Sequence, residues 1–100
     1  PITRADGAAD RLNELEWDGE RLWANRWQTD EIVRIDLRCR RVDGVLDASA
    51  LTARAATAAA GRPIDVLNGI AHLPDSGDLL LTGKYWPLLF EVAVTEDARR

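Results

Sequence analysis

The sequence contains two strand-rich segments that resemble each other, and this internal repeat limits the folds open to the chain. Leu12-Asn13 in the first segment matches Leu67-Asn68 in the second, an offset of 68 − 13 = 55 residues. Residues 22–26 then align with residues 80–84 at an offset of 80 − 22 = 58, which we attribute to a longer second turn. A period near 55 residues with several short antiparallel strands per unit is typical of a β-propeller blade. Two blades cannot close a ring, so the repeat predicts an all-β, partial β-propeller that needs further blades.

The first repeat, residues 12–47, predicts a blade of four short strands. Asp18-Gly19 separates the first two strands, and this dipeptide tolerates the positive φ angles of a type I′ hairpin turn. In the second strand Leu22 and Ala24 alternate with Trp23, so these residues are expected on opposite faces of the sheet. The predicted strands are residues 12–17, 21–25, 31–36 and 42–46.

The stretch between the repeats has a different composition, because residues 48–60 are rich in Ala, Leu, Thr and Arg and lack β-branched aliphatic residues. This composition favours a helix, which Asp47 or Ser49 could cap and which Gly61 and Pro63 would end. A short alanine-rich helix is only marginally stable by itself, so a surface loop with helical content fits equally well. Residues 48–63 are therefore predicted as a helical insert or loop.

The second repeat occupies residues 64–95 and predicts a second, partial blade. Its expected strands are residues 66–73, 79–82 and 89–94, and Pro74-Asp75-Ser76-Gly77 forms the first turn. The polar residues 1–11 predict a lead-in loop, and residues 96–100 predict a frayed tail.

Length and composition exclude several classes of protein. One hundred residues, of which 46% are hydrophobic and 30% charged, make one globular domain with a thin core. A net charge of −4 argues against a nucleic-acid surface. Cys39 and His72 are the only residues of their types, so no zinc site of the Cys/His kind can form, and we expect neither metal nor cofactor.

The ends of the chain and its apolar runs carry further expectations. No run of apolar residues is long enough to cross a membrane and no signal peptide is visible, so we expect no membrane partner. The chain opens at Pro1 and contains no methionine, which favours a processed or partial chain.

Four blocks of sequence, taken in order, carry a resemblance to a known family. The blocks are Leu12-Asn13-Glu14-Leu15-Glu16-Trp17, Ala24-Asn25-Arg26-Trp27-Gln28-Thr29-Asp30, Ile64-Asp65-Val66-Leu67-Asn68-Gly69-Ile70-Ala71, and Thr82-Gly83-Lys84-Tyr85-Trp86-Pro87 with Phe90-Glu91. Together they resemble the C-terminal portion of the glutaminyl-peptide cyclotransferases of plant and bacterial type, and cover about two-fifths of a family domain. The resemblance implies a five-bladed propeller without metal. It also implies that N-terminal glutamine of peptides is converted to pyroglutamate with release of ammonia.

The resemblance further implies the residues of the site. Asn13 is similar to the family asparagine that hydrogen-bonds the substrate, Trp27 to a tryptophan that walls the pocket, and Lys84 to a lysine that points into the central channel. An amide, a flat apolar ring and a cation suit these three roles. Lys84 and Asn13 are thus the expected catalytic residues, and Asn13, Trp27 and Trp86 the expected substrate contacts.

The resemblance implies that the family's catalytic glutamate lies in earlier blades, and we do not expect Glu14 or Glu16 to replace it. The partners implied are therefore the missing N-terminal blades of the same propeller, and peptide or protein substrates that begin with glutamine. The 100 residues alone are expected to be inactive. Family members are commonly exported, which implies an extracytoplasmic location, secreted or periplasmic.

Each candidate residue also has a structural interpretation. Asn13 and Asn68 hold equivalent places in the two repeats, so this asparagine could be a feature of blade geometry that is used twice. Lys84 could be a solvated lysine at the end of a strand. Trp17 and Trp23 are expected in packing or on the surface. The residues Gln28, Thr29 and Asp30 are expected to form a turn at the rim of the pocket, with Asp30 capping local backbone.

Two other functions stay open at this point. The first is a non-catalytic propeller module that binds peptide N-termini or another small ligand. The second is a calcium-dependent lactonase on a related propeller, which would need converging Asp, Glu and Asn ligands that these motifs do not present. Ammonia release from a peptide that begins with glutamine separates catalysis from binding alone.

Overall fold

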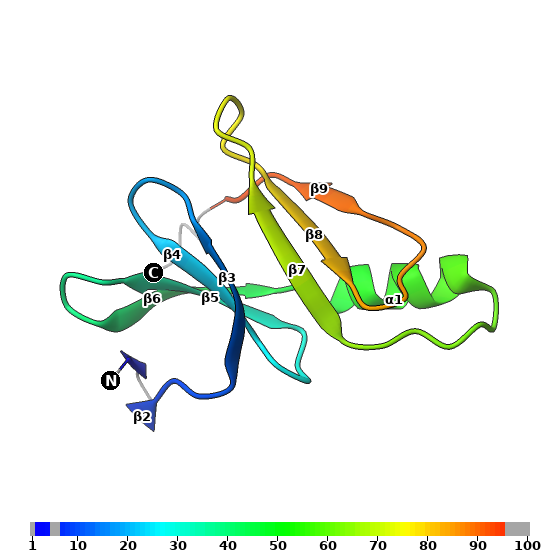
Figure 1. Ribbon diagram of the computed structural model, residues 1–100, viewed down its shortest axis with the longest axis horizontal. Helices are drawn as coiled ribbons and strands as arrows, with labels where there is room; N and C mark the ends of the chain where they lie inside the picture. Colours follow the sequence, from blue (N-terminus) through cyan, green and yellow to red (C-terminus); the bar gives the residue numbers. More distant parts are fainter. Residues whose placement is uncertain (1, 5–6, 96–100) are drawn as a thin grey trace.

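The computed structural model describes residues 2–4 and 7–95, which form two β-sheets and one helix (Figure 1). Their elements are β1 (Thr3–Arg4), β2 (Gly7–Ala8), β3 (Leu12–Trp17), β4 (Leu22–Arg26), β5 (Glu31–Asp36), β6 (Arg41–Asp47), α1 (Ser49–Ala59), β7 (Leu67–His72), β8 (Leu79–Gly83) and β9 (Phe90–Val92). The tail predicted over residues 96–100 lies outside the described residues. No helix in the described part of the chain is long and apolar enough to cross a membrane.

The first sheet has six strands in the order β2-β1-β6-β5-β4-β3. Its antiparallel meander from β3 to β6 confirms the four strands predicted in the first repeat, with ends that differ by at most one residue. The predicted loop over residues 1–11 is wrong in part, because β1 and β2 extend this sheet. The N–H of Thr3 donates to the carbonyl of Arg40 at 3.0 Å, so the edge beside β6 is occupied by backbone partners.

The turn between β3 and β4 differs from the predicted type I′ turn. Gly19 has a positive φ of 102°, whereas that of Asp18 is not positive. The N–H of Asp18 donates to the carbonyl of Arg21 across the turn. The Asp18 carboxylate accepts the N–H groups of Glu20 and Arg21 at 2.8 and 2.7 Å. This side chain closes the turn, so a second positive φ is not needed.

The segment between the sheets is the helix α1, which settles the choice between helix and loop. Ala48 is its N-cap, and the Asp47 carboxylate accepts the N–H of Ser49 at 2.9 Å. The helix ends in left-handed backbone at Ala60, where φ is 53°, and Gly61 follows with a φ of 87°. Its buried residues are Ala55 and Ala59, and Leu51 packs against the apolar cluster between the two sheets.

The second sheet has three antiparallel strands in the order β7-β8-β9. β7 and β8 lie where the sequence predicts them, but β9 is shorter than the predicted strand over residues 89–94. It pairs only with Leu79, Leu80 and Leu81 of β8, and these pairs set its length.

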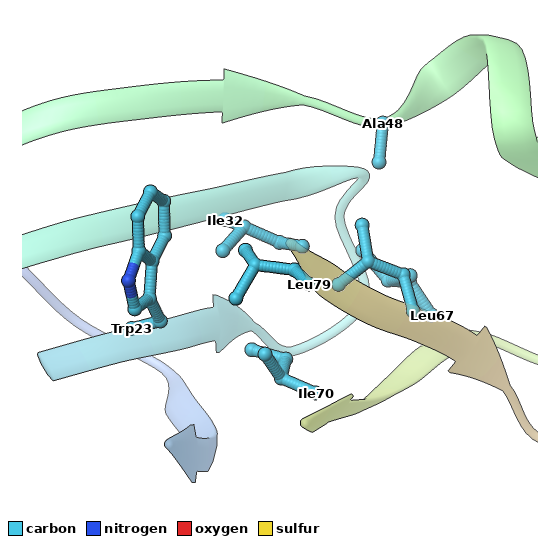
Figure 2. Packing of buried hydrophobic residues seen from close by; sticks show 7 residues of the cluster. Trp23, Ile32, Ala48, Leu67, Ile70 and Leu79 are labelled. Atoms are coloured by element: carbon cyan, nitrogen blue, oxygen red, sulfur yellow. The ribbon is translucent and has the colours of Figure 1, made fainter. Parts of the chain in front are cut away.

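The two sheets pack through one apolar cluster (Figure 2). Trp23 and Ile32 of the first sheet contact the second sheet, and Leu22 and Ala24 belong to a cluster on the other face, as the alternation predicts. The buried residues of the cluster between the sheets are Trp23, Ile32, Ala48, Leu67, Ile70, Leu79 and Leu81. Burial of such side chains stabilises a fold by about 1.5–3 kcal/mol each. The fold is therefore mostly β, with its core between the sheets.

The first strands of the two repeats, β3 and β7, lie beside each other (Figure 1). Asn13 Nδ2 donates to Asn68 Oδ1 at 3.1 Å, and the Glu16 carboxylate accepts the N–H of His72 at 2.8 Å. Asn13 precedes Glu16 and Asn68 precedes His72, so β3 and β7 run in the same direction. We call this contact the β3–β7 seam.

Candidate functional site

The register of the sheets corrects the alignment of the two repeats. Arg26 pairs with Leu12, and Gly83 pairs with Leu67, so Gly83 is the equivalent of Arg26 at an offset of 83 − 26 = 57. The strands β5 and β9 keep this offset. The offset of 58 predicted for this part of the repeat is therefore wrong by one residue, because strand pairing and not residue type decides the match.

Each repeat has a β-bulge at the start of its first strand. The bulge residues are Asn13 and Glu14 in β3, and Asn68 and Gly69 in β7. In each case two residues lie opposite a single residue of the next strand, which bends the strand and changes the direction of its side chains. The equivalence of Asn13 and Asn68 is thus confirmed by the register, and both belong to the same irregularity.

A buried asparagine holds the two bulges together. Asn25 of β4 has no exposed surface. Its Oδ1 accepts the N–H of Glu14 at 2.8 Å, and its Nδ2 donates to the carbonyl of Leu67 at 2.9 Å. This role of Asn25 was not predicted from the sequence. The available signal was an amide that directly follows the apolar residues Leu22, Trp23 and Ala24, since a buried amide needs partners.

The turns after β4 and β8 have the same backbone conformation. Gln28 and Tyr85 are the third residues of these turns and have φ values of 66° and 62°. A backbone hydrogen bond joins the first and fourth residues of each turn, at 3.0 and 3.2 Å. A positive φ at the third residue is the mark of a type II turn and is uncommon outside glycine. The second residues of the two turns are Trp27 and Lys84, which are therefore equivalent positions.

Three of the predicted site residues lie at one end of the two sheets. The N–H of Trp27 donates to the carbonyl of Arg11 at 2.7 Å, just before β3, and the N–H of Lys84 donates to the carbonyl of Val66 at 3.0 Å, just before β7. Asn13 lies at the start of β3 and bonds Asn68 at the start of β7. We call this end of the molecule the bulge end.

The side chains of the bulge end are open to solvent. Asn13 and Lys84 are exposed, and Trp27 keeps 47% of its surface accessible. Within residues 2–4 and 7–95, no carboxylate forms an ion pair with the Lys84 ammonium. A hollow of about 320 Å³ lies beside the turn after β4 and is lined by Gln28, Thr29, Asp30, Thr52, Ile64, Asp65, Val66 and Leu67.

Trp86, the fourth predicted site residue, is used for packing. Its indole N–H donates to the carbonyl of Asp65 at 2.9 Å. Its ring lies so close to Gly83 that a Cβ there would be 2.2 Å from it, and it packs nearly perpendicular to the ring of Phe90, with 6.1 Å between the ring centroids. The predicted contact of Trp86 with substrate stays a prediction. Trp23, which is 6% exposed, confirms the expected packing role.

The turn at the rim of the hollow is held differently from the prediction. Thr29 Oγ1 donates to the carbonyl of Arg26 at 2.8 Å and accepts the N–H of Glu31 at 3.1 Å. Asp30 instead accepts the hydroxyl of Thr52 from α1 at 2.6 Å. Thr29 therefore caps the local backbone, and Asp30 bonds the helix α1 instead.

Arginines surround the carboxylate at the start of β5. Arg4 Nη1 lies 2.5 Å and Arg26 Nη1 3.5 Å from Glu31 Oε1. The hydrogen bond from Arg4 holds the pKa of Glu31 below its usual value, although partial burial acts in the opposite direction. Arg26 also donates to Asp10 at 3.0 Å. This network fixes the N-terminal segment beside the bulge end.

The remaining acidic residues near Asn13 are not gathered into a cluster. Glu16 is engaged with the backbone of His72 along the β3–β7 seam. In the part of the chain that the structure describes, no three His, Cys, Asp or Glu side chains lie close enough to hold a metal ion.

Comparison with known proteins places these features in a family. The family model described as Glutamine cyclotransferase matches residues 1–94. The chain belongs to the glutamine cyclotransferase family. This finding confirms the resemblance carried by the four sequence blocks.

Two relatives show how much of the family this chain spans. A glutaminyl-peptide cyclotransferase from Arabidopsis thaliana is 41% identical over 96 residues, which cover 95% of this chain and 30% of the relative. The crystal structure of Myxococcus xanthus glutaminyl cyclase superposes with a TM-score of 0.82 at 41% identity, covering 92% of this chain and 39% of that one. The chain therefore spans about two-fifths of the solved relative and less than a third of the plant protein.

Proposed function

We propose that the chain is part of a glutaminyl-peptide cyclotransferase, which converts N-terminal glutamine of peptides to pyroglutamate. The observation that carries this proposal is the placement of Asn13, Trp27 and Lys84. They come from segments up to 84 − 13 = 71 residues apart and lie at the bulge end of both sheets. Family membership supports the reaction class.

The reaction makes three demands on a site. The uncharged α-amine attacks the side-chain carbonyl carbon of the same glutamine, so a new C–N bond forms and a negative charge develops on the oxygen. The original amide C–N bond then breaks, and its nitrogen leaves as ammonia after it gains the proton lost by the amine. The site must therefore orient the amine, stabilise the oxyanion and move one proton.

The residues of the bulge end can meet the first two demands. Asn13 offers both a donor and an acceptor to the substrate. The half-exposed ring of Trp27 can cover the reacting groups and exclude water. The exposed ammonium of Lys84 can stabilise the oxyanion, because none of its charge is taken up by a carboxylate of the described residues.

The proton carrier and the rest of the ring belong to the proposal. Glu16 is bonded to backbone and is not proposed as the carrier. We place the carboxylate that moves the proton in further blades, as the family resemblance implies. A propeller repeats one antiparallel sheet around its axis, and the neighbouring meanders β3–β6 and β7–β9, whose first strands run in the same direction, support this arrangement. Five blades would complete it, and the 100 residues alone would be inactive.

Ammonia release tests this function directly. The full-length protein is incubated with a peptide that begins with glutamine, and ammonia and pyroglutamyl peptide are measured. We expect both products from the wild type, and a loss of about 100-fold in kcat/KM for Lys84→Ala, since removal of one oxyanion-stabilising group has this order of effect.

The matched control is Arg38→Ala, which removes an exposed cation from the turn between β5 and β6, at the opposite end of the first sheet. Its kcat/KM should stay at the wild-type value. Binding of the peptide without ammonia release would instead support a non-catalytic module. Unchanged kinetics of Lys84→Ala in an active enzyme would remove the role of Lys84.

A further inference from the structure

The hydrogen bond between Asn13 and Asn68 restricts how the Asn13 amide can face a ligand. Asn13 Nδ2 donates to Asn68 Oδ1 at 3.1 Å, and of the two side chains Asn13 is the exposed one. A side-chain amide carries two N–H donors and one carbonyl oxygen. The contact uses one donor of Asn13, so it leaves the oxygen and the second N–H for a ligand. Without this contact the Asn13 amide could rotate by half a turn, so that its Oδ1 and Nδ2 change places.

The backbone beneath the two asparagines is fixed by a third. The buried Asn25 bonds the N–H of Glu14, next to Asn13, and the carbonyl of Leu67, next to Asn68. These bonds of 2.8 and 2.9 Å are shielded from water, because Asn25 is 0% exposed. The distance between the two bulges is therefore set independently of any ligand.

We propose that Asn68 is a positioning residue, which fixes the amide of Asn13 so that its oxygen faces the α-amine of the N-terminal glutamine. This inference rests on the proposed function. An amide that is already oriented loses less freedom when the substrate binds, and it holds the amine in the geometry for attack. The second repeat thus supplies an orienting group in addition to Lys84.

A second contact along the same seam supplies the control. Glu16 accepts the N–H of His72 at 2.8 Å, so it also joins β3 to β7, near the ends of these strands opposite the bulge end. Removing either contact should reduce the stability of the seam. Only removal of the Asn68 contact should change how Asn13 meets the substrate.

A double-mutant cycle in the full-length protein tests the inference. Asn68→Ala should lower kcat/KM for a peptide that begins with glutamine about fivefold, the value of one hydrogen bond. In an Asn13→Ala background the same substitution should have no further effect on kcat/KM. Asn68→Asp keeps an acceptor for Asn13 and should stay within about twofold of the wild type. Glu16→Ala should lower the melting temperature and leave kcat/KM unchanged.

Several outcomes would overturn the inference. One is a wild-type kcat/KM for Asn68→Ala in an active enzyme, and another is an equal loss with and without Asn13. If Asn68→Ala does not fold, Asn68→Ser replaces it, because the shorter hydroxyl does not reach the amide of Asn13. A wild-type protein that releases no ammonia would overturn the proposed function itself, so the two failures are distinguishable.

Discussion

The two repeats bend their first strands in the same way but hold the bend with different side chains. In the first repeat, the bulge at Asn13-Glu14 is bonded by the amide of the buried Asn25. In the second repeat Thr82 takes the place opposite the bulge, and the missing side chain of Gly69 makes room for it. A Cβ on Gly69 would lie 2.8 Å from Thr82 Cγ2. The bulge in β3 thus depends on a hydrogen bond from Glu14 to Asn25, and the bulge in β7 depends on a glycine that leaves space for Thr82.

The turns after β4 and β8 have the same backbone conformation but carry side chains of different chemistry. Trp27 and Lys84 occupy the same position in equivalent turns, each followed by a residue with positive φ. One copy therefore provides an aromatic ring and the other a cation. Asn13 and Asn68, in contrast, keep the same side chain in both copies and bond each other.

The largest expected effect on stability comes from Asn25, whose equivalent in the second repeat is Thr82. Asn25→Ala should reduce the free energy of unfolding by about 3 kcal/mol, because the N–H of Glu14 and the carbonyl of Leu67 lose their buried partner. Thr82→Ala at the equivalent position should cost only about 1 kcal/mol, since it removes one exposed hydrogen bond to Leu88. Urea unfolding of the full-length protein measures both values. Equal losses would contradict the difference between the two bulges.

A smaller effect is expected at the glycine of the second bulge. Gly69 has a φ of 147°, and an added Cβ meets Thr82. Gly69→Ala should therefore destabilise the protein by about 2 kcal/mol through strain and overlap. The same substitution in a Thr82→Ser background should cost less, because serine has no Cγ2. If the loss is identical in both backgrounds, contact with Thr82 is not the cause and backbone strain alone explains it.

The smallest effect on stability concerns Glu31 at the start of β5, which forms ion pairs with Arg4 and Arg26. Arg4 holds the pKa of Glu31 below the usual 4.5, so the carboxylate stabilises the folded state above that value. This contribution to stability decreases as the pH falls below 4.5, the usual pKa, and is gone once the pH is below the lower pKa of Glu31 in the folded protein. Glu31→Gln should lower stability near neutral pH by about 1 kcal/mol and flatten its dependence on acid.

Unfolding curves between about pH 6 and pH 3 measure this dependence. Leu88, the equivalent residue at 31 + 57 = 88, carries no charge, so Leu88→Ala is the matched variant whose acid dependence should follow the wild type. A wild-type slope in Glu31→Gln would show that the Arg4 contact contributes nothing.

Much of the fold could be predicted from the sequence because its strands alternate and the turns after β3 and β7 contain glycine. The strands β3 and β5 have their predicted ends, and the helix follows the change in composition. β1 and β2 could not be predicted, because two-residue strands have no periodicity and depend on the distant edge of β6. The offset between the repeats was wrong by one residue for a similar reason, since only pairing defines equivalence.

The sequence motifs predicted that three of the candidate residues would lie close together, and their role in a site stays a prediction. Asn13, Trp27 and Lys84 stand in blocks that resemble the family, and the structure brings their segments to one end. Trp86 stands in the same block, but its ring folds back over Gly83, a contact that spacing does not reveal. Asn25 was missed because strand alternation describes faces and gives no information on which buried amide bonds two strands at once.

The most direct test is a crystal structure of the full-length protein with a pyroglutamyl peptide, the product of the proposed reaction. We expect the Asn13 amide to hydrogen-bond the ring, the Trp27 indole to lie against it, and the Lys84 ammonium to approach its carbonyl oxygen. A product ring bound away from these three side chains would show that they do not form the substrate site.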